Sequence, residues 1–332
     1  MPNARSALLD AFLAQHRWAA AQREPLPQDA STRSYSRLSH ADRTALVMDA
    51  PPETETKTAA FVRVAEALSR HQLSAPKVYA ADLEHGFLLI EDFGQASFAR
   101  VLSAQPDRQS SLYQSAGDVV QALNGVELSS ASRYDAAELK RELEVFCDHW
   151  WPDAFGAGMP KHVRRDFYAC WAEPLRLLEA AACQYPALTL RDFHVDNLFD
   201  LPGRAGPASV GLIDFQDALT GHAAYDLVSL LQDARRDVPR AVQSSVLAQV
   251  DAALNLPDFK TIYTLYGAQR ALKILGVFVR LANQHQKPAY RQHLPRTWRR
   301  VMMNLGEPKL ADLAAWIEAY ILNADISLTA HA

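Results

Sequence analysis

The sequence lacks most features of secreted, disulfide-linked or nucleic-acid-binding proteins. It has only three cysteines among 332 residues, Cys147, Cys170 and Cys183, and no Cys-x-x-Cys pair. This pattern excludes a redox motif or zinc knuckle and predicts reduced, buried thiols in a cytosolic protein. The 34 basic and 38 acidic residues give a net charge of −4, so no broad basic surface is available to bind a nucleic acid backbone.

Long apolar runs and several nucleotide-binding or hydrolase motifs are also missing. The strongest apolar run, residues 274–279, is bounded by Lys273 and Arg280 and is much shorter than a membrane span. Polar residues interrupt the first 20 residues, so they favour an amphipathic helix over a secretory signal. We therefore expect a cytoplasmic protein. The sequence contains no Walker A loop, no G-x-G-x-x-G and no G-x-S-x-G elbow, which argues against P-loop, Rossmann and nucleophilic hydrolase chemistry.

The residues that are present predict an α+β protein of about two domains. Residues 31–92 contain short runs rich in β-branched and aromatic residues, which predict a small sheet. We expect a helix between the second and third predicted strands of this sheet, because Phe61, Val64 and Leu68 fall at helical spacing. After Gly94 the pattern becomes mainly helical, with a short hairpin near residue 205. We predict a small N-terminal antiparallel-sheet lobe, residues 1–94, and a larger, mainly helical C-terminal lobe, residues 95–332.

The predicted hairpin contains the most informative stretch. It reads LRDFHVDN over residues 190–197, followed by LIDF over residues 212–215. Phosphoryl transfer to a hydroxyl needs one carboxylate to orient the nucleophile and accept its proton, and oxygen ligands for a Mg²⁺ ion on the nucleotide phosphates. Asp192 fits the first role, and Asn197 with Asp214 fits the second. The order and spacing follow those of the catalytic Asp, the Asn and the metal-binding Asp of kinases.

With this motif the sequence resembles the aminoglycoside phosphotransferase and choline kinase group, which has a protein-kinase-like, bilobal fold. The resemblance implies that Asp192 is the catalytic base, that Asn197 and Asp214 bind Mg²⁺, and that Asp226 supports the catalytic loop. The sequence departs from the family pattern before Asp192, where Leu190 and Arg191 replace the usual His-Gly.

Within this group, the sequence is most similar to the bacterial anomeric kinases that act on N-acetylmuramate and N-acetylglucosamine in cell-wall recycling. The similar segments are ASTRSYSRL at 30–38, VMDAPPE at 47–53, LIEDFG at 89–94 and GAQRALKILG at 267–276. The resemblance implies ATP as cosubstrate, Mg²⁺ as cofactor and the C1 hydroxyl of an amino sugar as acceptor. We expect a monomer whose partners are this small molecule and ATP, with no nucleic acid or membrane.

Two segments are candidates for binding the nucleotide. The hairpin that covers the phosphates in kinase-like folds corresponds to Ser31, Thr32 and Arg33, whose hydroxyl, backbone N–H and guanidinium groups suit phosphate. Glu91 and Phe93 follow a predicted strand at the place where an interlobe linker would pair with adenine.

The position expected for a phosphate-binding lysine on the third strand of the kinase-like sheet is occupied by Met48. Arg33, Arg37 or Lys57 could supply the missing charge, and the sequence does not choose among them.

The acceptor is expected to contact a helix over residues 261–280. Gln269, Arg270 and Lys273 lie there at helical spacing, and Arg270 or Lys273 could pair with the lactyl carboxylate of N-acetylmuramate. His194 is a further candidate for binding the acceptor.

Three other functions stay open. Asp192, His194 and Asp196 alternate along the chain and could converge on the metal of a hydrolase. Met48 and Leu190 motivate a non-catalytic, nucleotide-binding pseudokinase. A kinase of another small hydroxyl acceptor, such as an aminoglycoside or choline, is the third.

Overall fold

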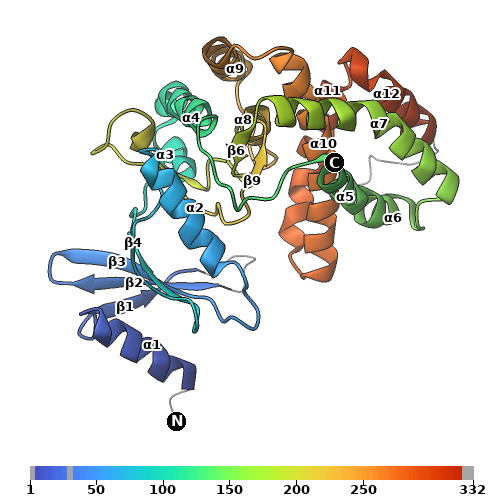
Figure 1. Cartoon of the computed structure of the whole chain (residues 1–332). Coiled ribbons are helices and arrows are strands. Elements are labelled where there is room, and N and C mark those ends of the chain that lie inside the picture. Colours follow the sequence, from blue (N-terminus) through green and yellow to red (C-terminus); the bar gives the residue numbers. More distant parts are fainter. Residues whose placement is uncertain (1–3, 28–32, 324–332) are drawn as a thin grey trace. The chain divides into compact units, whose positions relative to one another are not determined.

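The structure, a computed structural model, describes residues 4–27 and 33–323 (Figure 1). The chain folds into two compact units, each formed from three segments. The first comprises Met1–Ala122, Val126–Leu128 and Val195–Ala218, and the second comprises Leu123–Gly125, Ser129–His194 and Leu219–Ala332. Packing therefore assigns the first helices after Gly94 to the same unit as the N-terminal sheet. The functional boundary predicted at Gly94 stays a prediction.

The first unit contains an antiparallel sheet of five strands in the order β1-β2-β3-β5-β4. Its strands are β1 (Gln22–Pro25), β2 (Ser34–His40), β3 (Arg43–Asp49), β4 (Val78–Asp82) and β5 (Phe87–Ile90). The four predicted strands, β2 to β5, are confirmed within a few residues. β1 was not predicted because its four residues are all exposed and show no alternation of apolar and polar side chains.

Both faces of this sheet are covered by helices (Figure 1). On one face, Phe12 and Leu13 of α1 (Ala4–Gln15) pack in one cluster with Val47 and Leu89. The predicted stripe of α2 (Thr58–Arg70), formed by Phe61, Val64 and Leu68, is also buried. The sheet is thus held by apolar helix faces.

The remaining elements of the first unit follow the linker after β5. They are α3 (Phe98–Ala104), α4 (Gln109–Leu123), β7 (Leu198–Asp200) and β8 (Val210–Leu212). As expected, Ser97 caps α3, accepting a hydrogen bond from the Arg100 backbone N–H at 3.4 Å. β7 and β8 form the predicted hairpin, which is shorter than expected. Residues 187–189 belong instead to another strand, β6.

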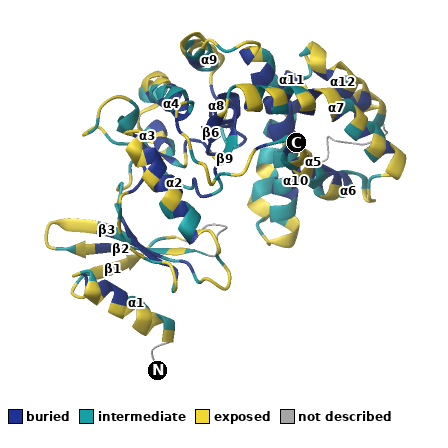
Figure 2. Cartoon of the chain, in the orientation of Figure 1, coloured by how far each residue is buried: buried dark blue, intermediate teal, exposed yellow. Residues whose placement is uncertain are grey.

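The second unit is mainly helical. Its α-helices are α5 (Ala136–Val145), α6 (Trp151–Phe155), α7 (Lys161–Gln184), α8 (Ala223–Leu231), α9 (Arg240–Leu254), α10 (Phe259–Gln284), α11 (Leu294–Asn304) and α12 (Ala311–Ile317). Two π-helices, η2 (Phe146–Trp150) and η6 (Glu318–Leu322), and two 3₁₀-helices, η4 (Pro288–His293) and η5 (Pro308–Leu310), adjoin them. β6 (Ala187–Thr189) pairs with β9 (Leu219–Gly221), and α8 begins two residues after β9 ends. α8 is buried along its whole length (Figure 2). α10 packs closely on the end of α5, because a Cβ atom at Gly276 would lie 2.2 Å from the Val145 carbonyl oxygen.

Two expectations from composition can be compared with the structure. None of the helices within residues 4–27 and 33–323 is long and apolar enough to cross a membrane. The cysteines are free, but only Cys147 is buried, whereas Cys183 is exposed. The prediction of three buried thiols is therefore wrong for Cys183, which lies near the end of the amphipathic helix α7.

Candidate active site

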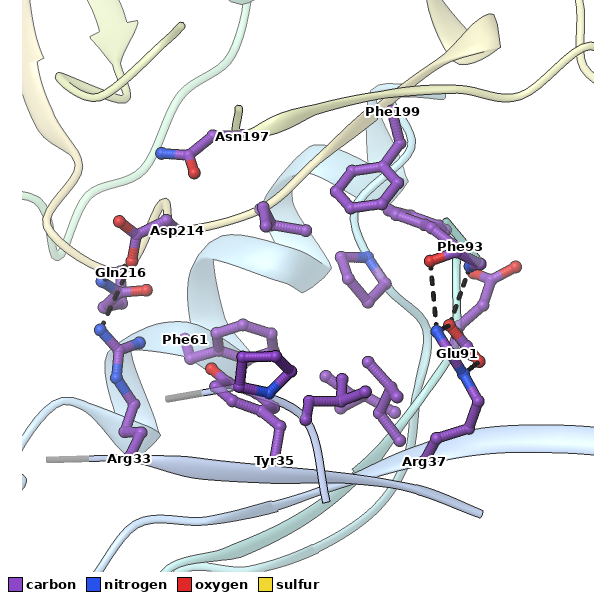
Figure 3. A pocket seen from close by; sticks show the side chains of 18 of the residues that line it. Arg33, Tyr35, Arg37, Phe61, Glu91, Phe93, Asn197, Phe199, Asp214 and Gln216 are labelled. Atoms are coloured by element: carbon purple, nitrogen blue, oxygen red, sulfur yellow. Dashed lines mark hydrogen bonds and ion pairs between the residues drawn. The ribbon is translucent and has the colours of Figure 1, made fainter. Parts of the chain in front are cut away.

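The first unit contains a cavity of about 640 Å³ (Figure 3). Its lining comes from β2, β3, β5, the linker after β5, and the β7–β8 hairpin with the loop that follows it. The predicted site residues among them are Arg33, Glu91, Phe93, Asn197 and Asp214. This volume is in the range of small-molecule and cofactor sites. The structure thus brings five predicted residues to one cavity, while Ser31 and Thr32 lie outside the described residues.

β2 and the residue before it present every second side chain to the cavity. Arg33, which immediately precedes β2, and Tyr35 and Arg37 on β2 are two residues apart, and all three line the cavity (Figure 3). Arg37 is bound to the linker: its Nε donates to Asp92 Oδ2 at 2.6 Å, and its Nη2 donates to the Gly94 carbonyl oxygen at 3.3 Å. Arg37 therefore fixes the linker against the sheet.

The linker residues Glu91 and Phe93 lie at the cavity edge predicted for adenine (Figure 3). The Glu91 backbone N–H is bonded to the Lys77 carbonyl oxygen at 2.9 Å, and its carboxylate is paired with Arg204. The Phe93 ring lies 5.9 Å from the Phe199 ring, centroid to centroid. These contacts give the cavity one aromatic wall on a fixed backbone.

Asn197 and Asp214 are held close to each other by the hairpin. The backbone N–H of Ile213, the residue before Asp214, donates to the Asn197 carbonyl oxygen at 3.1 Å. Asp214 has a left-handed backbone, with φ of 59°, and its Oδ1 accepts a bond from Gln216 Nε2 at 2.9 Å. The next residue, Phe215, is buried and its ring lies 4.9 Å from that of Phe61 in α2. α2 therefore anchors the turn that presents Asp214.

A carboxylate and an amide on the wall of one cavity form a donor set that fits Mg²⁺. Magnesium prefers oxygen ligands and is commonly held by one or two protein groups together with substrate phosphates. By contrast, no group of three or more His, Cys, Asp or Glu side chains within residues 4–27 and 33–323 is arranged to hold a metal ion. The convergent set of Asp192, His194 and Asp196 expected for a metal-dependent hydrolase is thus not found.

Asp192 belongs to the second unit, and Asp226 holds the backbone of the two residues before it. The Asp226 carboxylate accepts hydrogen bonds from the backbone N–H groups of Leu190 at 2.7 Å and Arg191 at 2.9 Å. Asp226 is 1% exposed, and burial raises its pKa to about 7 despite these two bonds. Arg191 takes a left-handed conformation, with φ of 74°, which turns the chain at this point. The Asp192 side chain is left half-exposed, at 51%.

A second buried carboxylate, Glu142 of α5, holds the side chains around this loop. Glu142 is 3% exposed and is bonded to Tyr134, to Arg191 and, at 2.5 Å, to Lys273 Nζ. Burial alone would raise the pKa of Glu142, but the charges of Lys273 and Arg191 outweigh it and lower this pKa to about 2. Glu142 is therefore an anion that compensates two partly buried cations.

Arg270 connects this network to Asp192. Its Nη1 donates to the Tyr225 hydroxyl at 3.0 Å, and its Nη2 lies 3.5 Å from Asp192 Oδ1. Desolvation alone would raise the pKa of Asp192, but the positive charges of Arg270 and Lys273 lower this pKa below its ordinary value. Asp192 is thus ionised at neutral pH.

The structure gives the predicted acceptor-binding residues contacts within the protein. Gln269 is fully buried and donates from Nε2 to Glu142 at 3.1 Å and to the Leu139 carbonyl oxygen at 3.2 Å. His194 is 5% exposed, and burial together with Arg235 lowers its pKa. Arg270 and Lys273 are bonded as described above. Contact of these residues with an acceptor stays a prediction, whereas the structure shows contacts of Arg270 with Asp192 and of Lys273 with Glu142.

Several residues of these networks were not predicted. Glu142 lies three residues from Leu139 on the α5 face that also carries Leu143, so a charged residue on an apolar helix face was the available signal. Tyr134 lies in a loop outside the predicted helices, and Tyr225, next to Asp226, gave no signal of its own. Glu55, which pairs with Arg33, gave no signal because it lies between a Pro-Pro turn and a helix.

The fold and the cavity are those of a kinase-like phosphotransferase. Several solved structures share this fold. A choline kinase from Streptococcus pneumoniae has a TM-score of 0.61 at 13% identity, covering 92% of this chain and 99% of the other. An aminoglycoside phosphotransferase from Streptomyces rimosus, in complex with ADP and streptomycin, has a TM-score of 0.55 at 18% identity, covering 81% and 98%.

Sequence comparison gives the family. Residues 22–264 match the phosphotransferase enzyme family, and the chain belongs to that family. It is 34% identical to the N-acetylmuramate/N-acetylglucosamine kinase of Caulobacter vibrioides over 96% of this chain and 97% of that protein. It is 32% identical to the protein of the same name from Pseudomonas aeruginosa, over 87% of this chain and 86% of that protein. The predicted family and enzyme class, an ATP-dependent phosphotransferase, are therefore confirmed.

The Glu142 network predicts a large loss of stability in Glu142→Gln. This change leaves Arg191 and Lys273 without their buried counter-charge, so we expect the free energy of unfolding to fall by about 3–5 kcal/mol. Glu138→Gln is the matched control, because Glu138 lies on the same helix in a more exposed pair with Arg141. The control is expected to change stability by less than about 1 kcal/mol. Urea denaturation measures both, and equal effects would contradict the role of Glu142.

Buried histidines predict how stability depends on pH. Burial lowers the pKa of His222 to about 4, whereas an unfolded histidine has a pKa of about 6.5. As pH falls below about 6.5, only the unfolded chain takes up this proton, so His222 alone removes up to about 3 kcal/mol of stability by pH 4. His222→Asn keeps a side-chain oxygen that can cap α8 in place of Nδ1, which accepts from Ala224. The variant should lose less stability than the parent between pH 7 and pH 5, and parallel curves would refute this.

Proposed function

We propose that this protein is an ATP-dependent kinase that phosphorylates the C1 hydroxyl of N-acetylmuramate, N-acetylglucosamine or both. The product is a sugar 1-phosphate, and we place the reaction in the cytoplasm, in the recycling of peptidoglycan sugars. The observation that carries this proposal is the arrangement of one loop, residues 190–197. It presents the half-exposed carboxylate of Asp192 and, five residues later, Asn197 on the wall of the cavity with Asp214.

Asp192 is assigned the role of catalytic base. Its carboxylate orients the acceptor hydroxyl and takes up the proton as the phosphoryl group is transferred. A low pKa makes Asp192 a weak base, which suits a loose transition state in which the hydroxyl loses its proton late. Positioning of the hydroxyl is therefore the larger part of its contribution.

Asn197 and Asp214 are assigned to Mg²⁺. A bound Mg²⁺ would neutralise charge on the phosphates of ATP and polarise the transferred phosphoryl group. Arg33, Glu91 and Phe93 line the same cavity and are assigned to ATP, with the phosphates toward Arg33 and the adenine toward the linker.

The identity of the acceptor is inferred from sequence similarity and not from the cavity. Two proteins named N-acetylmuramate/N-acetylglucosamine kinase match this chain over 87% or more of its length, and both are at least 32% identical to it. The segments at 30–38, 47–53, 89–94 and 267–276 carry the same resemblance. The position of transfer, C1, rests on this resemblance.

A panel of acceptors tests the proposal. Mg²⁺-dependent formation of ADP would be measured with N-acetylglucosamine, N-acetylmuramate, an aminoglycoside and choline, and the product would be identified by NMR. We expect a 1-phosphate of an N-acetyl sugar. Turnover with only the aminoglycoside or choline would refute the acceptor, and no turnover with measurable ATP binding would favour the pseudokinase.

Asp192→Asn separates chemistry from binding. The change removes the proton acceptor at nearly constant size, so we expect kcat to fall by about 100-fold or more with little change in the Kd of ATP. Asp196→Asn, four residues later on the same loop, is the matched control and should keep near-normal turnover. Retained turnover in Asp192→Asn would refute its role.

A further inference from the structure

The cavity lacks a cation on β3, the strand expected to supply one. Leu46 lines the cavity, and Met48 lies two residues later on the same face of β3. Met48 is fully buried, so this position is filled by an apolar side chain. Any positive charge that meets the nucleotide phosphates must come from a neighbouring element.

That element is the start of β2, the strand paired with β3, where Arg33 immediately precedes Ser34. The register places Tyr35 directly opposite Met48, and Arg33 lies two residues before Tyr35 on the cavity face. Arg33 Nε is 3.3 Å from Glu55 Oε2. Its Nη2 is 3.4 Å from Asp214 Oδ1, toward which Arg33 points in Figure 3. The Arg33 side chain is only 12% exposed. The guanidinium therefore lies between a fixed acid and the proposed metal ligand.

Glu55 is fixed at the start of α2. Its Oε1 accepts a hydrogen bond from the backbone N–H of Lys57 at 2.8 Å, while Oε2 faces Arg33. The Glu55 side chain is 10% exposed. Because both oxygens are engaged, this carboxylate can hold Arg33 in one position.

The other two cations considered for this role differ in their surroundings. Arg37 is paired with Asp92 at 2.6 Å and so fixes the linker. Lys57 is paired with Asp217 at 2.5 Å, but its side chain is 49% exposed and it is not among the residues that line the cavity.

We propose that Arg33, held by Glu55, is the phosphate-binding cation that replaces the missing lysine of β3. This inference rests on the proposed function of the cavity. In the structure Arg33 also contacts Asp214. With nucleotide and Mg²⁺ bound, Asp214 would hold the metal, and the Nη groups of Arg33 would donate to phosphate oxygens while its Nε stays on Glu55. Arginine suits this arrangement because its planar fork can engage two anions at once.

The test compares binding of ATP and adenosine by calorimetry in Arg33→Gln and in its matched control, Lys57→Gln. We expect Arg33→Gln to weaken ATP binding by about 10- to 100-fold, the loss typical of a charged hydrogen bond. Adenosine binding should change less than about twofold, because the adenine contacts lie elsewhere in the cavity. Lys57→Gln should weaken ATP binding by less than about threefold, as expected for a half-exposed ion pair. An equal loss in both variants, or none in Arg33→Gln, would overturn the assignment.

Two further variants keep the test independent of folding and of the acceptor. Arg33→Lys keeps the charge, so it should recover part of the ATP affinity that Arg33→Gln loses. Glu55→Gln removes a negative charge and should keep ATP affinity within about threefold, but lower kcat about tenfold because Arg33 is no longer held. An unchanged kcat would overturn the role of Glu55. If the parent protein binds ATP but phosphorylates no sugar, the proposed function fails, and the binding comparison still decides the role of Arg33.

Discussion

The geometry around Asp192 depends on two buried carboxylates that hold its loop from different sides. Asp226 accepts hydrogen bonds from the backbone N–H groups of Leu190 and Arg191, and Glu142 accepts one from the side chain of Arg191. A buried acid is costly unless it is well bonded, so each of these contacts restricts the loop to one conformation. The half-exposed carboxylate of Asp192 is fixed because the residues before it cannot move independently.

The first unit uses the same kind of contact around its cavity. Arg37 is tied to Asp92, Arg204 to Glu91, and Arg33 to Glu55 and Asp214. Each pair joins segments far apart in the sequence, so the charges order the linker and the hairpin against the sheet. Exposed ion pairs contribute little stability, but these are partly buried, and their value lies in position more than in net free energy.

Much of this could be read from the sequence where the signal is local. Alternation and helical spacing predicted β2 to β5 and α2, and the motif placed Asn197 and Asp214 next to the two ends of a hairpin. Glu142 and Glu55 escaped prediction because their roles depend on partners that are distant in the sequence, Arg191 and Lys273 for one and Arg33 for the other. β1 escaped because an exposed edge strand has no apolar face to reveal it.

The two departures from the family pattern have a common physical form. Leu190 and Arg191 replace a His-Gly pair, and the Arg191 side chain is bonded to a buried glutamate. Met48 occupies the position predicted for a lysine, and Arg33, just before the neighbouring strand β2, faces another glutamate. In both places an arginine with a carboxylate partner stands close to the altered position. Arginine stays charged when partly buried and binds along two directions, so it can be fixed by one acid and still meet a second anion. Losing a family residue therefore need not mean losing its charge, provided that a neighbouring backbone position can direct an arginine to the same place.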